Sequence, residues 1–493
     1  MRRYFALFLV LFGAALLPAQ DTSTKAQFTV TFTKEVSDKP FTGRVLIMLG
    51  RSGEPRNGPN WFGPLPFFAR DVKDVKPGEP IVIGNDAIGF PGPLAQLPAK
   101  EYVIQAVLDL DQSNTARIGS GPGNGYSQPV TAMLDPKKGF NVALKIDTVA
   151  KESPFRETDN IKLVEIESKL LSEFHGKPIK MRAGVKLPKS FATHTDKKYP
   201  ILFDIPGFGG NHRSVGRDMF TSQMPVEMIY VVLDPDCRTG HHVFADSANN
   251  GPYGQALIEE LIPEIEKRYR GIGQPTARFL TGHSSGGWSS LWLQVTYPDF
   301  FGGTWSTAPD PVDFRDFQRI NLYEPGANMF TEATGASRPL ARSGDKPIIF
   351  YKPFSDMEVV MGRGGQLFSF EAVFSPKDGN GQPRPLWNRT TGAVDTETAR
   401  YWEKYDICLQ LKRHWDTLGP KLKGKIHVFM GDKDTFYLDG ASKLLKADLA
   451  KLGSDAVVEI VPGKDHSTLM SAQLINRIAN EMADTFKKHH PTP

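Results

Sequence analysis

The sequence predicts an α/β chain of two domains: an all-β, sandwich-like N-terminal domain, then a mainly parallel sheet with helices on both faces. Residues 20–150 contain only short strand-like runs separated by Gly/Pro-rich turns, which is typical of a β-sandwich. From about residue 151, strand-like and helical runs alternate, and this order favours a parallel sheet. At 493 residues the chain is also too long for one compact core.

The first 19 residues have the composition of a secretory signal peptide. A basic start is followed by an apolar run too short to span a bilayer and by a small residue, Ala19. No later segment approaches the length of a membrane-spanning helix, so we expect a secreted or periplasmic protein with no membrane anchor once the signal is removed. A formal net charge of +4 is close to neutrality and gives no case for a nucleic-acid partner.

The N-terminal β domain is predicted to span residues 20–150. Its strands are expected at 28–33, 44–49, 81–83, 102–108 and 142–146. Such a module can bind a glycan or a partner protein, but it more often serves as a spacer or as a packing partner for the next domain. We favour this second role.

The second domain is predicted to span residues 151–493. Segments 163–171 and 179–187 are expected to pair as antiparallel strands at its start. Further strands are predicted at 200–205, 228–233, around 279–280, at 425–430 and at 456–461, and helices at 253–270, 288–297, 401–415, 441–452 and 469–488. Ligands of such sheets bind at the carboxyl ends of the strands.

The alternation lapses between about 308 and 401. This stretch is rich in Gly, Pro and Phe, and it is read as irregular. An irregular segment of this length is unusual inside a compact domain unless it serves as a lid or binds substrate. We therefore expect an insertion that covers the functional site.

A serine lies in a pattern that predicts a very tight turn between a strand and a helix. Gly282-His-Ser-Ser-Gly286 follows the apolar pair Phe279-Leu280 and precedes the helical run 288–297. Glycines flank Ser284 because a side chain at either position would collide with the neighbouring strand or helix. The turn would expose the Ser284 hydroxyl and direct the backbone N–H of Ser285 toward a developing oxyanion.

A nucleophilic serine needs an imidazole as base and a carboxylate that orients the imidazole. In this topology the order along the chain is serine, acid, histidine, each just past a strand. Two late strands are followed by Asp434 and His466, in that order. Asp432 is the alternative acid, but Asp434 has the spacing Gly-x-x-Asp after its strand, so we assign Asp434.

Other residues of these types have weaker claims. His283 is expected to pack against the sheet, and the pair His241-His242 either lines the pocket or belongs to an ordinary loop. Cys237 and Cys408 are the only cysteines; they could form one disulfide, and they cannot build a metal site. The sequence contains no metal-ligand spacing such as His-Glu-x-x-His, so no metal is expected.

The second oxyanion donor is expected from the loop after strand 200–205. Glycines in Pro206-Gly-Phe-Gly-Gly210 let the backbone approach a ligand closely. The backbone N–H of Phe208, or failing that of Gly209, is the candidate beside Ser285.

These motifs resemble the α/β-hydrolase superfamily, and within it the esterase D-like family that includes feruloyl, enterochelin and S-formylglutathione esterases and the mycolyltransferases. The resemblance covers about 155–305 and 402–490. Its motifs are the loop 206–210, Asn250-Gly-Pro-Tyr-Gly with the end of helix 253–270, the serine turn, Gly431-Asp-Lys-Asp434 and Pro462-Gly-Lys-Asp-His466. It implies a serine carboxylesterase that works through an acyl-enzyme without a cofactor. The sequence departs from the family in Pro206, where many relatives have His, and in the long 308–401 insertion.

The sequence therefore predicts an exported serine esterase acting on a small-molecule or glycan-linked ester. Three alternatives stay open: a peptidase of the prolyl oligopeptidase type, an acyltransferase, and a binding protein on a hydrolase fold. Prolyl oligopeptidases carry a much larger β-propeller before the hydrolase than the roughly 130 residues present here. A binding protein has no need to retain all three of Ser284, Asp434 and His466.

Overall fold

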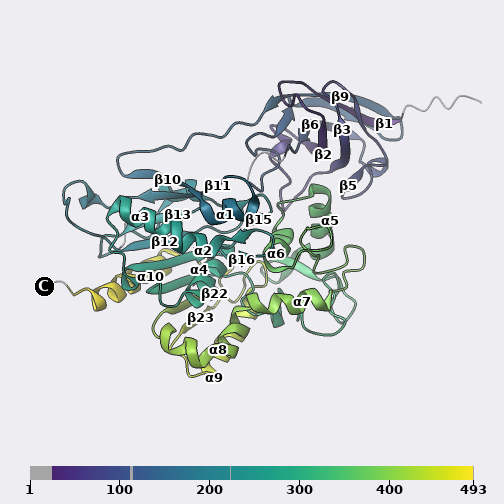
Figure 1. Cartoon of the computed structure of the whole chain (residues 1–493). Coiled ribbons are helices and arrows are strands. Elements are labelled where there is room, and N and C mark those ends of the chain that lie inside the picture. Colours follow the sequence, from purple (N-terminus) through teal and green to yellow (C-terminus); the bar gives the residue numbers. More distant parts are fainter. Residues whose placement is uncertain (1–24, 111–114, 222–223, 492–493) are drawn as a thin grey trace, which may run out of the picture.

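The computed structural model describes residues 25–110, 115–221 and 224–491. The strands of the first 150 residues form one body, drawn in purple and blue at the top of Figure 1, and the later residues surround a second sheet below it. The predicted signal peptide lies outside the described residues. Within them, no helix has the combination of length and apolar character that crossing a bilayer requires.

Nine strands in the described N-terminal part are hydrogen-bonded in the order β4-β1-β9-β7-β6-β2-β3-β5, with β8 on β6. They are β1 (Ala26–Phe32), β2 (Phe41–Gly50), β3 (Phe67–Val75), β4 (Ile81–Ile83), β5 (Ile88–Phe90), β6 (Lys100–Leu108), β7 (Gly125–Ser127), β8 (Val130–Leu134) and β9 (Phe140–Val149). All five predicted strands are present. The other four were missed because β5, β7 and β8 have only three to five residues and β3 begins with three apolar residues in a row.

The N-terminal core comes from alternate side chains of these strands. Phe28, Val30 and Phe32 of β1 all point inward and are at most 1% exposed. One feature differs from the expected sandwich: hydrogen bonds join the strands into a single sheet rather than two, because β1 pairs with β9 in parallel and with β4 on its other side.

The second sheet has eight strands in the order β10-β11-β13-β12-β18-β19-β22-β23. The pairs β10–β11 and β11–β13 are antiparallel, and the remaining pairs are parallel. The strands are β10 (Ile161–Ser168), β11 (Ile179–Lys186), β12 (Ile201–Ile205), β13 (Ile229–Leu233), β18 (Arg278–His283), β19 (Gly303–Thr307), β22 (Ile426–Gly431) and β23 (Val457–Val461). The predicted alternation of strands and helices is therefore present, in a sheet that is mixed at one edge.

Helices cover both faces of this sheet. Alternate residues of β12 face opposite sides of the sheet. Ile201 and Phe203 pack with the helical run Tyr253–Tyr269, whereas Leu202 packs with α10. The helices of this part are α1 (Lys169–His175), α2 (Tyr253–Ala256), α3 (Ile262–Tyr269), α4 (Ser285–Thr296), α8 (Ile407–Leu422), α9 (Asp439–Lys451) and α10 (Ala472–His489). The predicted helix 253–270 thus forms, with a π-helical turn at Leu257–Leu261 between α2 and α3. The end of segment 163–171, predicted as strand, is instead the start of α1.

Several short elements complete the described chain. Two-residue strand pairs are β14 (Asp236–Cys237) with β15 (Gly240–His241), and β16 (Asp246–Ser247) with β17 (Gly251–Pro252). Short 3₁₀ turns are η1 (Pro55–Asn57), η2 (Leu94–Gln96), η3 (Lys189–Phe191), η4 (His212–Arg217), η6 (Pro275–Ala277), η7 (Phe314–Asp316) and η8 (Glu403–Tyr405).

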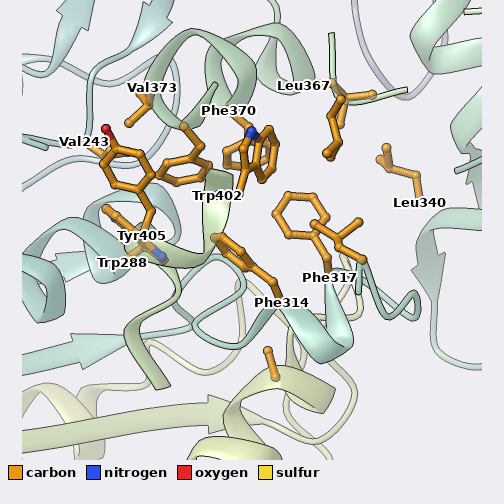
Figure 2. Close-up of a cluster of buried hydrophobic side chains, with 14 of the residues drawn as sticks. Val243, Trp288, Phe314, Phe317, Leu340, Leu367, Phe370, Val373, Trp402 and Tyr405 are labelled. Atoms are coloured by element: carbon orange, nitrogen blue, oxygen red, sulfur yellow. The ribbon is translucent and has the colours of Figure 1, made fainter. Parts of the chain in front are cut away.

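The segment 308–401 is more regular than the sequence suggested. It contains the hairpin β20 (Pro339–Ser343) and β21 (Lys346–Phe350) and the helices α5 (Tyr351–Met361), α6 (Gln366–Phe374) and α7 (Thr396–Trp402). The helical period was hidden because α6 is buried on nearly every side. Figure 2 shows the reason: Phe370 and Phe314 from the segment meet Trp402 and Trp288 in one aromatic core.

The segment also contacts the N-terminal sheet. Arg44 on β2 donates hydrogen bonds to the carbonyl oxygens of Val359 and Val360 at the end of α5. Arg363, just after α5, forms a bidentate ion pair with Asp109 at 2.7 Å, and both side chains are largely buried. The segment therefore packs against both sheets.

Candidate active site

Ser284 lies in the strained turn that the sequence predicts. It connects β18 to α4 with φ 61° and ψ −126°, a conformation that non-glycine residues rarely adopt. A Cβ on Gly286 would lie 1.7 Å from the carbonyl oxygen of Ile205, and one on Gly282 would lie 2.2 Å from that of Gly286. Only glycine fits at either position, so the surrounding strand and helix impose the conformation of Ser284.

Asp434 and His466 meet at the carboxyl ends of β22 and β23. His466 Nδ1 lies 2.7 Å from Asp434 Oδ2, and Asp434 is fully buried. The other carboxylate oxygen, Oδ1, accepts hydrogen bonds from the backbone N–H groups of Phe436 and Leu438. The carboxylate is thus fixed by its own loop and orients the imidazole.

The two candidate acids have different partners. Asp432 Oδ1 accepts a hydrogen bond of 2.6 Å from the backbone N–H of Gly463 and stabilises the turn before His466. Of the two, Asp434 is the one in contact with the imidazole.

The charge state of His466 reflects two opposing effects. Burial lowers its pKa, but the hydrogen bond to Asp434 and the charge of that carboxylate raise it more, so the pKa lies above its usual value. His283, whose ring packs 4.6 Å from that of His466, has its pKa lowered to about 3 by burial and by the neighbouring imidazole. At most one of the two imidazoles, that of His466, is therefore protonated to the cation near neutral pH.

Within the part of the chain that the structure describes, Ser284 Oγ forms no hydrogen bond with His466. The structure thus brings the acid and the histidine together, and it places the serine in the adjoining turn. The ring contact between His283, next to Ser284, and His466 places the two parts side by side.

The glycine loop after β12 lies against Ser284. A Cβ on Gly207 would be 3.1 Å from Ser284 Cβ, so a side chain there would press on the serine. Among the described residues, the backbone N–H groups of Phe208 and Ser285 have no hydrogen-bond acceptor. Both candidate donors are consequently available to a ligand.

A buried carboxyl group beside the turn was missed by sequence reasoning. Asp310 is 6% exposed, accepts a hydrogen bond of 2.5 Å from Ser285 Oγ, and donates its backbone N–H to the Ser284 carbonyl oxygen. Burial raises its pKa to about 6. Asp310 follows β19, the neighbour of β18 in the sheet, and this position could have identified it from the sequence as a candidate site residue.

Aromatic side chains from distant segments also line the site and were missed. Trp61, in the loop between β2 and β3, stacks on Phe208 with ring centroids 5.4 Å apart. It also contacts Phe436, whose ring packs edge-on against His466 at 5.0 Å. No local pattern marks Trp61, because its partners lie far away in the sequence.

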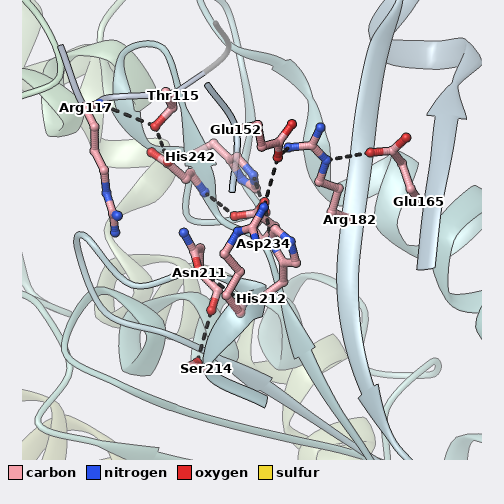
Figure 3. Close-up of polar contacts among 12 residues, drawn as sticks. Thr115, Arg117, Glu152, Glu165, Arg182, Asn211, His212, Ser214, Asp234 and His242 are labelled. Atoms are coloured by element: carbon pink, nitrogen blue, oxygen red, sulfur yellow. Dashed lines mark hydrogen bonds and ion pairs between the residues drawn. The ribbon is translucent and has the colours of Figure 1, made fainter. Parts of the chain in front are cut away.

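Three other histidines, His212, His241 and His242, have contacts within the protein. His241 and His242 are buried, with pKa values lowered by burial, and each has Nε2 near a carbonyl oxygen, that of Pro206 and Asp234 respectively. His241 also lines a cavity described below. A second histidine–aspartate pair, His212 and Asp234 at 2.7 Å, belongs to the polar cluster of Figure 3.

The cysteines are both buried and unpaired, so the disulfide is absent. Within the described residues, one group has the composition of a metal site: Asp313, Cys408 and Asp448. Arg315 forms ion pairs with both carboxylates, at 2.5 and 2.6 Å, and Lys412 and Lys451 also pair with Asp448. Protein cations therefore satisfy this group.

Residues 177–468, more than half of the chain, match the protein family described as "Putative esterase". The chain belongs to this family, as its motifs predict. None of the curated proteins matches it.

Solved structures similar to this chain share low sequence identity with it. A ferulic acid esterase is 15% identical, with 66% of this chain and 99% of that chain covered and a TM-score of 0.40. An S-formylglutathione hydrolase from Agrobacterium tumefaciens is 14% identical, with coverages of 67% and 94% and a TM-score of 0.39. The fluorophosphonate-binding serine hydrolase F of Staphylococcus aureus is 13% identical, with coverages of 66% and 98% and a TM-score of 0.41.

Proposed function

We propose that this protein is an exported serine carboxylesterase with an α/β-hydrolase catalytic domain, residues 151–493, behind a separate β domain, residues 20–150. The observation that carries the proposal is the hydrogen-bonded pair Asp434–His466 beside the strained Ser284. Its substrate is a small-molecule or glycan-linked ester. The secretory pattern of residues 1–19 supports a secreted or periplasmic location.

In the proposed reaction, His466 Nε2 takes the proton of Ser284 Oγ while the oxygen attacks the ester carbonyl carbon. Asp434 keeps the other proton on Nδ1 and stabilises the imidazolium. The N–H groups of Phe208 and Ser285 donate to the oxyanion, and the loss of one such donor typically costs about 10²–10³ in turnover. The hydrogen bond from serine to histidine is often long without substrate and tightens in the complex.

The tetrahedral intermediate collapses, and the alcohol leaves with the proton held by His466. Water then attacks the acyl group on Ser284, with His466 again as base, and releases the acid. A prolyl oligopeptidase-type peptidase is less favoured, because strands β1–β9 form one sheet rather than separate propeller blades.

A fluorophosphonate probe tests the nucleophile directly. It should label the wild-type protein and leave Ser284→Ala unlabelled, and hydrolysis of p-nitrophenyl acetate should disappear in the same variant. Persistent labelling of Ser284→Ala would assign the reactive serine elsewhere.

A further inference from the structure

A cavity of about 440 Å³ lies between the N-terminal sheet and the glycine loop of the second domain. Met48 and Val107 contribute one wall, Phe208 and Gly209 another, and Met361 at the end of α5 a third. Its volume is within the range of about 300–1,000 Å³ found for small-molecule sites. Three parts of the chain thus enclose a space that none of them forms alone.

The glycine loop after β12 lies next to both Ser284 and the cavity. Gly207 touches Ser284 on one side, and the next two residues, Phe208 and Gly209, line the cavity on the other. Trp61 connects the same two places, because it lines the cavity, stacks on Phe208 and contacts the Phe436 ring that packs on His466. Phe208 and Trp61 thus lie at the wall of the cavity that is nearest to the described contacts of Ser284 and His466.

Several polar groups at the edge of the cavity have partners within the protein. Asp236 accepts hydrogen bonds from Thr115 Oγ1 and from the backbone N–H of Ala116. Arg117, visible at the left of Figure 3, donates from Nη2 to the Gly209 carbonyl oxygen at 2.5 Å.

Two further polar side chains are also paired. The Arg56 guanidinium lies 3.8 Å above the Tyr126 ring and pairs with Glu54. Burial lowers the pKa of His241 to about 4, so that its ring is neutral. What the cavity offers to a ligand is mainly the apolar surface of its Met, Val, Ile, Trp and Phe side chains.

We propose that this cavity binds the apolar part of the ester substrate, and that Trp61 of the N-terminal domain is a specificity-determining residue. The inference rests on the proposed esterase function. Apolar burial favours longer chains by roughly four-fold in affinity per buried methylene. The N-terminal domain thereby selects the substrate rather than acting as a spacer.

Two variants test the cavity by opposite means. Trp61→Ala removes one wall, and Met361→Trp fills the space from the partly buried end of α5. The matched control is Met133→Ala, a 65% exposed side chain on β8 of the same sheet. Circular dichroism and thermal unfolding establish that each variant is folded.

Two substrate series distinguish the acyl side from the alcohol side. One series uses p-nitrophenyl acetate, butyrate and octanoate; the other uses ethyl, butyl and octyl acetate. For each series we compare kcat/KM for the longest ester with kcat/KM for the shortest. In one of the two series, this ratio should fall at least ten-fold in both Trp61→Ala and Met361→Trp. It should stay unchanged in Met133→Ala. An unchanged ratio in both series would overturn the proposal.

A binding measurement separates this inference from the function on which it rests. Titration calorimetry of octanoic acid and octanol into Ser284→Ala should detect binding of one of them, weakened at least ten-fold in Ser284→Ala/Trp61→Ala. Equal affinity in the two proteins would contradict the cavity assignment whatever the hydrolysis assays give. Hydrolysis that survives in Ser284→Ala would instead contradict the esterase mechanism.

Discussion

Ser284, Asp434 and His466 follow the ends of parallel strands, whereas the side chains around them come from three segments that are far apart in the sequence. Backbone sterics and backbone hydrogen bonds hold the first group: Gly286 leaves room for no side chain, and Asp434 is fixed by N–H groups of its own loop. The surrounding group is held by contacts between rings, such as those of Trp61 with Phe208 and Phe436. The positions of Ser284, Asp434 and His466 are therefore encoded locally, and the walls around them depend on tertiary packing.

Asp434→Asn, which changes one of the three residues at the strand ends, should have the largest effect on activity. An amide cannot hold the proton on Nδ1 as a carboxylate does, and we expect kcat to fall about 10³–10⁴-fold. Because the hydrogen bond and charge of Asp434 outweigh burial and raise the pKa of His466, the acidic limb of the kcat/KM profile should also move to lower pH. Asp432→Asn is the control, and an equal loss in that variant would break the assignment.

Phe374→Ala tests the tertiary packing of the segment 308–401. Phe374 is 2% exposed and contacts Trp288, Phe314 and Trp402 in the aromatic core of the insertion. Its loss leaves a cavity and should lower the free energy of unfolding by about 3–5 kcal/mol, measured by urea denaturation. Ile348→Ala on β21, 44% exposed, should change it by less than about 1 kcal/mol. Similar losses in the two variants would mean that the aromatic core is not what stabilises this segment.

Asp310→Asn tests a side chain between the two groups. The pKa of Asp310 is raised by burial to about 6, so the folded state retains its proton while the unfolded state loses it near pH 4. Stability from this group is present below pH 4 and is lost as the pH rises toward 6. Relative to wild type, the variant should gain roughly 2–3 kcal/mol between pH 4 and pH 8, measured by denaturation at both values. Asp356→Asn, on the exposed side of α5, should show no such gain.

Arg117→Ala should have the smallest effect. This side chain joins the N-terminal part of the chain to the glycine loop after β12. If Phe208 is the proposed oxyanion donor, losing the hydrogen bond from Arg117 to the Gly209 carbonyl should lower kcat about three- to ten-fold, because the loop that carries Phe208 loses a support. Arg117→Lys should recover part of the activity, and Arg51→Ala, an exposed arginine in the loop after β2, should have full activity. A change in KM alone would assign Arg117 to substrate binding.

Features that depend on nearby residues could be predicted from the sequence, and features that depend on tertiary contacts could not. The turn at Ser284 and the loop ends at Asp434 and His466 depend on residues a few positions away, so their glycines, strand pattern and order along the chain sufficed to predict the turn and the contact between Asp434 and His466. The helix α6 escaped because its burial on nearly every side removes the polar face that reveals a helical period. Trp61 escaped because its partners are brought to it only by the tertiary fold.

The contacts of Trp61 limit where the chain can be cut into separate parts. Its ring contacts Phe208, Phe354 and Phe436, which all lie beyond residue 150. A shortened chain beginning near residue 151 would present these three rings to water, beside an exposed apolar surface of the kind that promotes self-association. Domain exchange with a related esterase would therefore have to transfer the loop between β2 and β3 together with its aromatic partners.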